Sequence, residues 1–239
     1  MKGAIIQSGY LPWKGYFDIV NEVDLFVFLE DVQYTRSDWR NRNKIMTAHG
    51  PKWLSVPVQQ RHGQSIFEAR IDYSHRWQAK HKRAIQLSYG RAAEYDEYAG
   101  SILSIYDTHF ETISQLNMHA IRIVSRLLGI NTRFVNSLQL KVSGTKDDRV
   151  IGICQAVGIN HYLSGPAARS YIDEAKFARA SIALEYKDFC GYPEYRQLYG
   201  PFEHHVSAID VLFNCGQRAP YYIWGWRYDV NCSPRHVRT

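Results

Sequence analysis

The chain has 239 residues, of which 45% are hydrophobic and 22% are charged, a composition typical of a folded protein that can bury a substantial core. Its formal net charge of +6 favours anionic ligands, but no run of five or six Lys and Arg residues indicates a nucleic-acid-binding arm. The four cysteines lie far apart without a CxxC pair, which argues against a zinc site or a disulfide framework. No stretch approaches ~18 uninterrupted apolar residues and the N-terminus lacks a signal-peptide pattern, so we expect a cytoplasmic protein without a membrane span.

Polar side chains follow two predicted strands near the start of the chain. Residues 4–7 form a short apolar strand that leads into an aromatic turn, and residues 24–29 form a second strand. Because open α/β sheets build ligand sites at the carboxyl ends of strands, we expect a site here. The second strand is followed by a carboxylate, a phenol, two amides and a guanidinium, which belong to Asp31, Tyr34, Asn41, Arg42 and Asn43.

Asp31 is the candidate general base of this cluster, because a carboxylate near apolar walls can have a raised pKa. Arg42 could bind a phosphate or carboxylate, and the amides could orient a sugar or an amine. Alternatively, Asp31 and the asparagines only satisfy backbone groups of the loop, as these residue types commonly do. The density of polar groups favours a ligand site for the cluster as a whole.

The next segments predict a hairpin and a helix. Residues 53–58 and 66–71 alternate between apolar and polar side chains, which predicts a small antiparallel hairpin inserted beside the main sheet. A helix follows at 75–89, with Ser74 as its cap. His81 lies on the apolar face of this helix beside Lys82, and its spacing alone slightly favours a packing role over a contact to phosphate or carboxylate.

Helices and strands alternate through the rest of the chain. We predict helices at 94–109, 111–128, 145–157, 171–180 and 206–213, and strands at 132–136, 161–163 and 182–186. This order predicts an α/β fold: a mostly parallel sheet flanked by helices, with the inserted hairpin at about 53–71 and a helical C-terminal extension at about 187–227. Residues 1–227 would form a single domain and the polar residues 228–239 a disordered tail.

Two positions at element boundaries could contribute to a second site. Thr145 and Lys146 open a predicted helix, where a plain N-terminal cap is favoured over a phosphate cradle. Ser164 ends a predicted strand, a place where parallel sheets present ligand contacts.

The C-terminal extension holds a candidate nucleophile. His204, His205, Asp210 and Cys215 could together run acyl transfer through a thioester. The spacing instead favours a buried, inert cysteine. The two histidines could be exposed loop residues, or one of them could enter the pocket. The ten histidines are scattered without a metal-ligand spacing, so we predict no metal site.

Six segments, in this order, resemble the WbqC-like family of bacterial proteins: IIQSGYLPWKGYFDIV, FVFLEDVQYTRSDWRNRNKI, WLSVPV, WQAKHKRAI, HYLSG and VSAIDVLFNCG. They span nearly the whole chain, and the first two are the most specific. The family usually has Gln-Pro before the aromatic turn, whereas here Gln7 is followed by Ser8 and Gly9. By position in the motifs, the resemblance adds further residues to the predicted site: Gln7, Tyr10, Pro12, Tyr16, His81 and Lys82.

The resemblance implies a role in surface-polysaccharide (O-antigen) biosynthesis. We expect an acyl- or aminoacyltransferase acting on the amino group of a nucleotide-linked amino sugar, with Asp31 or His81 as the base and no tightly bound cofactor. The acyl or aminoacyl donor is left open, with aminoacyl-tRNA among the candidates, and the sequence does not indicate an oligomeric state. Two alternatives stay open: a nucleotidylyltransferase-like enzyme that uses a nucleoside triphosphate, and a non-catalytic module that binds RNA or a glycan.

Overall fold

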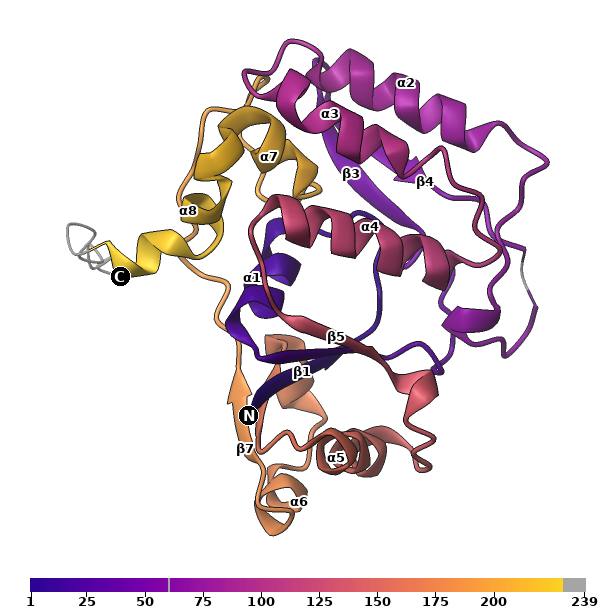
Figure 1. Ribbon diagram of the computed structural model, residues 1–239, viewed down its shortest axis with the longest axis vertical. Coiled ribbons are helices and arrows are strands. Elements are labelled where there is room, and N and C mark those ends of the chain that lie inside the picture. Colours follow the sequence, from indigo (N-terminus) through magenta and orange to yellow (C-terminus); the bar gives the residue numbers. More distant parts are fainter. Residues whose placement is uncertain (60, 230–239) are drawn as a thin grey trace.

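The central sheet holds five parallel strands within the residues that the computed structural model describes, 1–59 and 61–229 (Figure 1). The strands are β1 (Lys2–Ile6), β2 (Leu25–Phe28), β5 (Arg133–Asn136), β6 (His161–Ser164) and β7 (Ala183–Tyr186). Their order in the sheet is β5-β2-β1-β6-β7, and every pairing is parallel. The first strand of the chain is therefore the middle strand of the sheet.

This order creates a topological switch point between β1 and β6. From β1 the chain moves outward through β2 to β5, then returns to β6 on the other side of β1 and moves outward to β7. Helices that leave the sheet on opposite sides of such a point separate, which opens a crevice at the carboxyl ends of the two strands. A ligand site is expected at that crevice.

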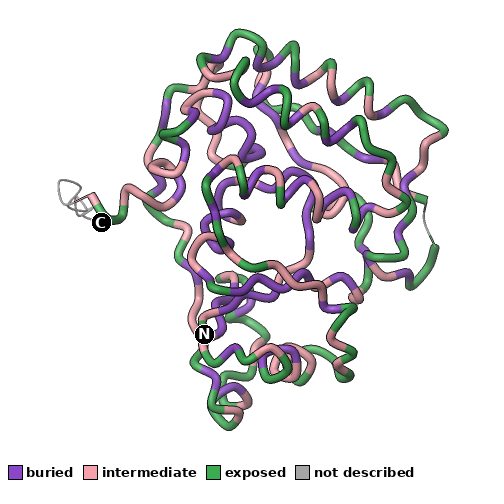
Figure 2. Tube along the Cα trace, viewed as in Figure 1, coloured by how far each residue is buried: buried purple, intermediate pink, exposed green. Residues whose placement is uncertain are grey.

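Alternation along the strands divides the interior into two cores. Ala4, Phe26 and Phe28 pack into a larger core with α1 (Lys14–Glu22) and α4 (Ile113–Leu127). Ile5, Leu25 and Val27 point to the opposite face, against α5 (Lys146–Val157) and α6 (Glu174–Arg179). Figure 1 shows α1 and α4 on one side of the sheet and α5 and α6 on the other. In Figure 2 the inner strands β1 and β2 are mostly buried, which explains their nearly continuous apolar sequence, whereas the edge strands β5 and β7 are only partly buried.

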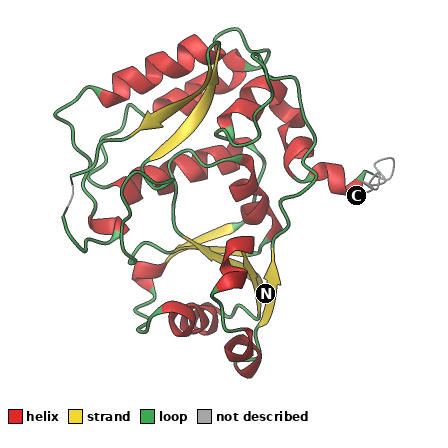
Figure 3. Cartoon of the chain, turned by 180° about the vertical axis from the view of Figure 1, so that it is seen from behind, coloured by secondary structure: helices red, strands yellow, loops and turns green. Residues whose placement is uncertain are grey.

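The segment between β2 and α4 forms a second layer above α4. It contains β3 (Arg42–Thr47), β4 (Gly50–Ser55), α2 (Trp77–Tyr89) and α3 (Tyr95–Ser104), and Figure 3 shows its two strands apart from the main sheet. Ser74 does not cap α2, whose N-terminal cap position is Arg76.

The predicted position of the hairpin is wrong. β4 pairs with β3 and not with residues 66–71, which instead contain a short 3₁₀ helix, Ile66–Glu68. The hydroxyl and backbone N–H of Ser65 both bind the Glu68 carboxylate, which favours this helical turn. Only one isolated bridge, Val58 to Ile71, joins the two predicted strands in the described residues.

The C-terminal extension is helical, as predicted, and contains α7 (Ile209–Cys215) and α8 (Ala219–Ile223). Its first helix begins later than residue 206, because Ser207 bridges to Trp13 and the Ala208 N–H donates to the Pro12 carbonyl at 2.8 Å. The predicted tail lies outside the described residues from 230 onward, while Tyr228 ends a 3₁₀ turn, Gly225–Tyr228. The α/β fold with a mostly parallel sheet, a hairpin and a helical extension is confirmed.

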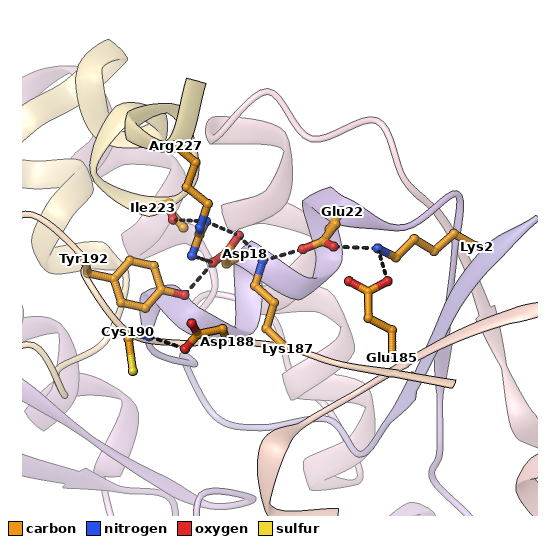
Figure 4. Close-up of polar contacts among 10 residues, drawn as sticks. All are labelled: Lys2, Asp18, Glu22, Glu185, Lys187, Asp188, Cys190, Tyr192, Ile223 and Arg227. Carbon is orange, nitrogen blue, oxygen red and sulfur yellow. Dashed lines mark hydrogen bonds and ion pairs between the residues drawn. The ribbon is translucent and has the colours of Figure 1, made fainter. Parts of the chain in front are cut away.

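A buried ion network attaches this extension to α1 (Figure 4). Asp18, which is 1% exposed, accepts hydrogen bonds from Lys187 at 2.8 Å, from Arg227 at 2.8 and 3.1 Å, and from the Tyr192 hydroxyl at 2.5 Å. Lys187 also pairs with Glu22. In the described part of the chain, no helix combines the length and the apolar character that crossing a membrane requires.

Candidate functional site

A cavity of about 390 Å³ opens at the carboxyl end of β1, beside the switch point. Its walls come from three distant parts of the chain: residues 6–9 with Pro12, Trp13 and Tyr16, then Trp39, Arg40 and Asn43, and finally His205 from the C-terminal extension. The volume lies in the range of small-molecule sites, and the walls are mainly apolar, with the rings of Trp13, Tyr16 and Trp39 and a few polar groups, as such sites usually are.

The turn after β1 is held in a strained conformation against the loop that carries Trp39. Leu11 has a φ of 42°, and the Asn43 side-chain amide donates to its carbonyl at 2.8 Å. The Tyr10 N–H donates to the Trp39 carbonyl at 2.8 Å. A Cβ on Gly9 would lie 3.2 Å from that same carbonyl, so the close approach favours glycine. Strain of this kind persists where surrounding contacts hold it, and it occurs often at functional sites.

Ser8 connects the cavity to a buried carboxylate. Glu30, the second residue after β2, is fully buried and accepts the Ser8 backbone N–H and the Ser8 hydroxyl, each at 2.9 Å. Burial raises the pKa of Glu30, although hydrogen bonds from Ser114 and Ser8 act in the opposite direction. Proline could supply neither donor, so the Ser8 that distinguishes this chain from the Gln-Pro pattern has a defined role. It holds the Glu30 carboxylate beneath the cavity.

His205 presents an oriented imidazole to the cavity. Its Nδ1 lies 3.2 Å from Oε1 of Glu203, and its backbone N–H donates to the same oxygen at 2.7 Å. That backbone hydrogen bond makes the largest contribution to lowering the pKa of Glu203. Because an ionised carboxylate can only accept, a neutral His205 ring would carry its proton on Nδ1 and leave Nε2 as the unprotonated nitrogen. The ring is stacked on Trp13 with centroids 5.4 Å apart.

Arg40 supplies positive charge at the cavity wall. One guanidinium nitrogen pairs with Asp38, whereas the buried Nε has no hydrogen-bond partner among the described residues. The Arg40 carbonyl accepts from Asn117 at 2.8 Å, which anchors its backbone. An anionic group of a ligand would find a positioned guanidinium here.

A buried lysine lies next to the cavity, on the side that faces the C-terminal extension. Lys14 is 1% exposed, and its ammonium lies 4.9, 5.5 and 5.7 Å from the ring centroids of Tyr192, Tyr195 and Phe202. Its nitrogen has no hydrogen-bond partner among the described residues. Burial lowers the pKa of Lys14 to about 8, although the buried Asp210 acts in the opposite direction.

The structure brings some of the predicted site residues together and separates others. Gln7, Pro12, Tyr16 and Asn43 line the cavity. Tyr16 donates to the Gln7 carbonyl at 3.3 Å, and burial raises the pKa of Tyr16 well above its ordinary value. The amide of Asn43 is used by the backbone, since its Oδ1 also accepts the Lys44 N–H at 2.8 Å.

Tyr10 and His81 lie behind the cavity wall in the core. The Tyr10 hydroxyl is 2.8 Å from His81 Nδ1 and 2.6 Å from the Tyr106 hydroxyl. His81 is only 6% exposed, and burial lowers its pKa to about 4. These contacts fit the packing role that the helical spacing of His81 favours. Neighbouring Lys82 is paired with Asp107 at 2.6 Å, away from the cavity.

The predicted loop cluster is dispersed. Asp31 accepts from Ser137 at 2.8 Å and pairs with Arg149, and it does not line the cavity. Asn41 donates to the Val56 carbonyl at 2.9 Å, the backbone role considered as the alternative. Burial raises the pKa of the Tyr34 phenol to about 12. The Arg42 guanidinium lies over the Trp53 ring.

The second predicted set does not form one site. Thr145 and Lys146 are exposed at the start of α5, and the Thr145 side chain makes no capping bond. Ser164 is buried, and its carbonyl accepts the Lys187 N–H at 2.9 Å.

The residues of the predicted thioester route do not form a catalytic set either. Asp210 is fully buried and accepts from Tyr195 at 2.6 Å and from Tyr89 and Gln197 at 2.9 Å. The buried Nδ1 of His204 has no hydrogen-bond partner among the described residues, and burial raises the pKa of Cys215 to about 12. A thiol with so high a pKa is a poor nucleophile. Within residues 1–59 and 61–229, no three His, Cys, Asp or Glu side chains gather as a metal site.

The sequence-based prediction assigned no site role to Glu30 or Lys14, and it considered His205 only together with His204 in the thioester set. Glu30 follows an apolar strand directly, a position where a carboxylate can be buried. Lys14 lies within the aromatic turn, between Trp13 and Gly15. His205 adjoins the predicted His204 and depends on the bridge between Ser207 and Trp13, which no local pattern indicates.

Comparison with known proteins agrees with the motifs. The WbqC-like protein family matches residues 7–222, which include every cavity-lining segment except Ile6. The chain belongs to the WbqC-like protein family. A relative in Mycobacterium tuberculosis, named Uncharacterized protein Rv1507c, is 43% identical over 225 residues, covering 93% of this chain and 97% of the relative. No solved structure matches this WbqC-like chain.

Proposed function

We propose that this protein is a transferase of surface-polysaccharide biosynthesis that modifies the amino group of a nucleotide-linked amino sugar. The observation that carries the proposal is the cavity at the switch point, whose wall includes His205 with its Nδ1 beside the Glu203 carboxylate. Sugar rings stack on aromatic side chains, and the Arg40 guanidinium supplies positive charge for a phosphate. Family membership supports the sugar-related role.

In this proposal His205 replaces Asp31 and His81 as the base. Asp31 is engaged by Arg149 and Ser137, and His81 is buried against Tyr10. His205 Nε2 would take a proton from the sugar amine as the amine nitrogen forms a bond to the acyl carbon. The bond from that carbon to the donor's leaving group breaks, and the leaving group takes up a proton. Glu203 stabilises the imidazolium that forms between these steps.

The test follows the mass of the sugar product. The protein is incubated with dTDP- or UDP-linked amino sugars and activated acyl or aminoacyl donors. We expect His205→Gln to lower turnover about 100-fold or more, because positioned general bases contribute at least that much. His109→Gln is the matched control, since His109 is an exposed histidine stacked on Tyr73 and distant from the cavity lining. Absence of modified sugar with every donor, together with absence of nucleotide-sugar binding, would refute the proposal.

The strand order supports a second candidate, a nucleotidylyltransferase-like enzyme. Sheets in which the first strand is central and the second and third lie to one side frequently bind nucleotides at the switch point. This activity would release pyrophosphate from a nucleoside triphosphate, whereas acyl transfer would not. A non-catalytic binding module would bind its ligand and show neither product, and its affinity would not depend on His205.

A further inference from the structure

We propose that two exposed tryptophans beside the cavity form a second subsite, which binds the purine nucleotide portion of the group donor. The subsite, here called the Trp39–Trp53 ledge, consists of Trp39, Trp53, Arg42 and Lys44. It deepens the proposed function, on which it rests, by assigning a place and a chemical class to the second reactant.

The ledge offers open aromatic surface. Trp39 is 48% exposed and Trp53 is 40% exposed, and their ring centroids lie 5.5 Å apart with a tilt of 42°. Large aromatic side chains that are left this exposed next to each other commonly mark an interaction site. Together the two indoles present a surface wider than a single six-membered ring, which suits a bicyclic base.

The ledge is held in place before any ligand binds. The Trp39 N–H donates to the Asp38 carboxylate at 2.6 Å, and the Trp39 carbonyl accepts the Tyr10 N–H. Trp53 lies in β4 directly opposite Lys44 of β3. Both rings therefore stand on backbone that is fixed by hydrogen bonds, so little ordering entropy would be lost on binding.

Cations surround the Trp53 ring. The Arg42 guanidinium lies 4.4 Å and the Lys44 ammonium 5.4 Å from its centroid. The buried Nε of Arg42 has no hydrogen-bond partner among the described residues. An aromatic platform flanked by Arg and Lys side chains matches a flat base joined to a phosphate, the combination used in nucleotide recognition.

The ledge is continuous with the catalytic end of the cavity. Trp39 belongs to both, because it also lines the cavity. Lys44 contributes to the lowered pKa of Glu203, the partner of His205, and its carbonyl accepts the Ser207 N–H at 2.8 Å. A donor with its base on the ledge would direct its activated acyl group toward the His205 end of the cavity.

A purine nucleotide is the occupant that these observations favour. Coenzyme A thioesters, acyl adenylates and aminoacyl esters of tRNA share an adenosine phosphate, so one ledge could serve any of them. The sugar nucleotide would occupy the cavity itself. Pyrimidine nucleotides, with a single ring, would gain less from the pair of indoles.

The experiment measures binding and not turnover. AMP, adenosine and UMP are titrated into the wild-type protein by calorimetry, followed by dTDP- or UDP-linked sugars. We expect AMP to bind more tightly than UMP and adenosine. Trp53→Leu and Arg42→Gln should each weaken AMP binding by at least about fivefold, in line with the loss of one stacking or phosphate contact. Trp53→Phe, which keeps an aromatic ring, should retain most of the affinity.

Lys52→Gln is the matched control, since it removes a cation of the same hairpin that makes no contact with the Trp53 ring. Circular dichroism spectra establish that each variant is folded. No binding of AMP, equal binding of AMP and UMP, or unchanged AMP affinity in Trp53→Leu would overturn the inference. Nucleotide-sugar binding distinguishes the two failures. If only the ledge inference fails, the wild type and Trp53→Leu both still bind the nucleotide sugar. If the proposed function fails, the wild type itself does not bind it.

Discussion

Replacing Asp18 by alanine is expected to destabilise the protein by about 3 kcal/mol. Asp18 is 1% exposed and accepts hydrogen bonds from Lys187, Arg227 and Tyr192. Removing one partner of a buried ion pair costs about 3–5 kcal/mol, because the other charge is left buried and uncompensated. We take the lower end, since Lys187 keeps its pair with Glu22 and the Arg227 side chain is 27% exposed and can turn to water.

Urea denaturation followed by circular dichroism measures this loss. For a domain of this size, about 3 kcal/mol corresponds to a decrease in melting temperature of about 6–12 °C. Asp188→Ala is the control, because Asp188 is an exposed neighbour that accepts hydrogen bonds from the backbone N–H and the side chain of Cys190, and we expect a loss below about 1 kcal/mol. The double variant Asp18→Ala, Lys187→Met should recover part of the stability, since it removes the unpaired ammonium.

Two results would refute this reasoning. One is a loss below about 1 kcal/mol for Asp18→Ala, and the other is an equal loss for Asp188→Ala. Limited proteolysis offers an independent measure: because the network attaches residues 187–192 and Arg227 to α1, cleavage in the extension should be faster in Asp18→Ala.

Three further changes test the buried polar groups. Burial lowers the pKa of His81 to about 4 from 6.5, so the unfolded chain binds more protons than the folded chain between these pH values. The free energy of unfolding should therefore fall as the pH decreases from about 6.5 to 4. An NMR titration should show no protonation of His81 above about pH 5. Lys14 has a pKa of about 8 in the folded protein against 10.5 ordinarily, so the unfolded chain again binds more protons between these pH values. The free energy of unfolding should rise as the pH increases from about 8 to 10.5. In urea denaturation, Lys14→Met should lack this rise and should be as stable as the wild type at about pH 7. Ser8→Ala removes one hydrogen bond to the buried Glu30 carboxylate and should cost about 1–3 kcal/mol in urea denaturation, whereas a cost near zero would contradict the role assigned to Ser8.

The order of elements and the layer architecture could be predicted from the sequence, because buried parallel strands are apolar on both faces. Residues 4–7 and 24–29 illustrate this, and Gly129, with a φ of 73°, ends α4 as its position after the last apolar residue indicates. The hairpin was misplaced because the first half of β3 reads Arg42-Asn43-Lys44, which is too polar to be recognised as a strand. Its pairing depends on the turn at Gly50, with a φ of 90°, and on burial of Asn43 and Ile45.

The candidate site was predictable in its position but not in its chemistry. The strand ends point to the carboxyl edge of β1, and the cavity that Gln7 and Tyr16 line opens at this edge. Which polar groups face that cavity depends on contacts between residues far apart in the chain. The bridge from Trp13 to Ser207 brings His205 in, while Arg149 and Ser137 draw Asp31 away. Such contacts leave no periodic pattern in the sequence.

The central position of β1 has a consequence for how the chain folds during translation. β2 can pair with β1 as soon as both have left the ribosome, but the other edge of β1 stays unpaired until residues 161–164 have been synthesised. During that interval the nascent chain exposes an apolar strand edge of the kind that recruits other chains. The yield of soluble protein should therefore depend strongly on the rate of synthesis and on chaperone supply, more than the stability of the finished fold would suggest.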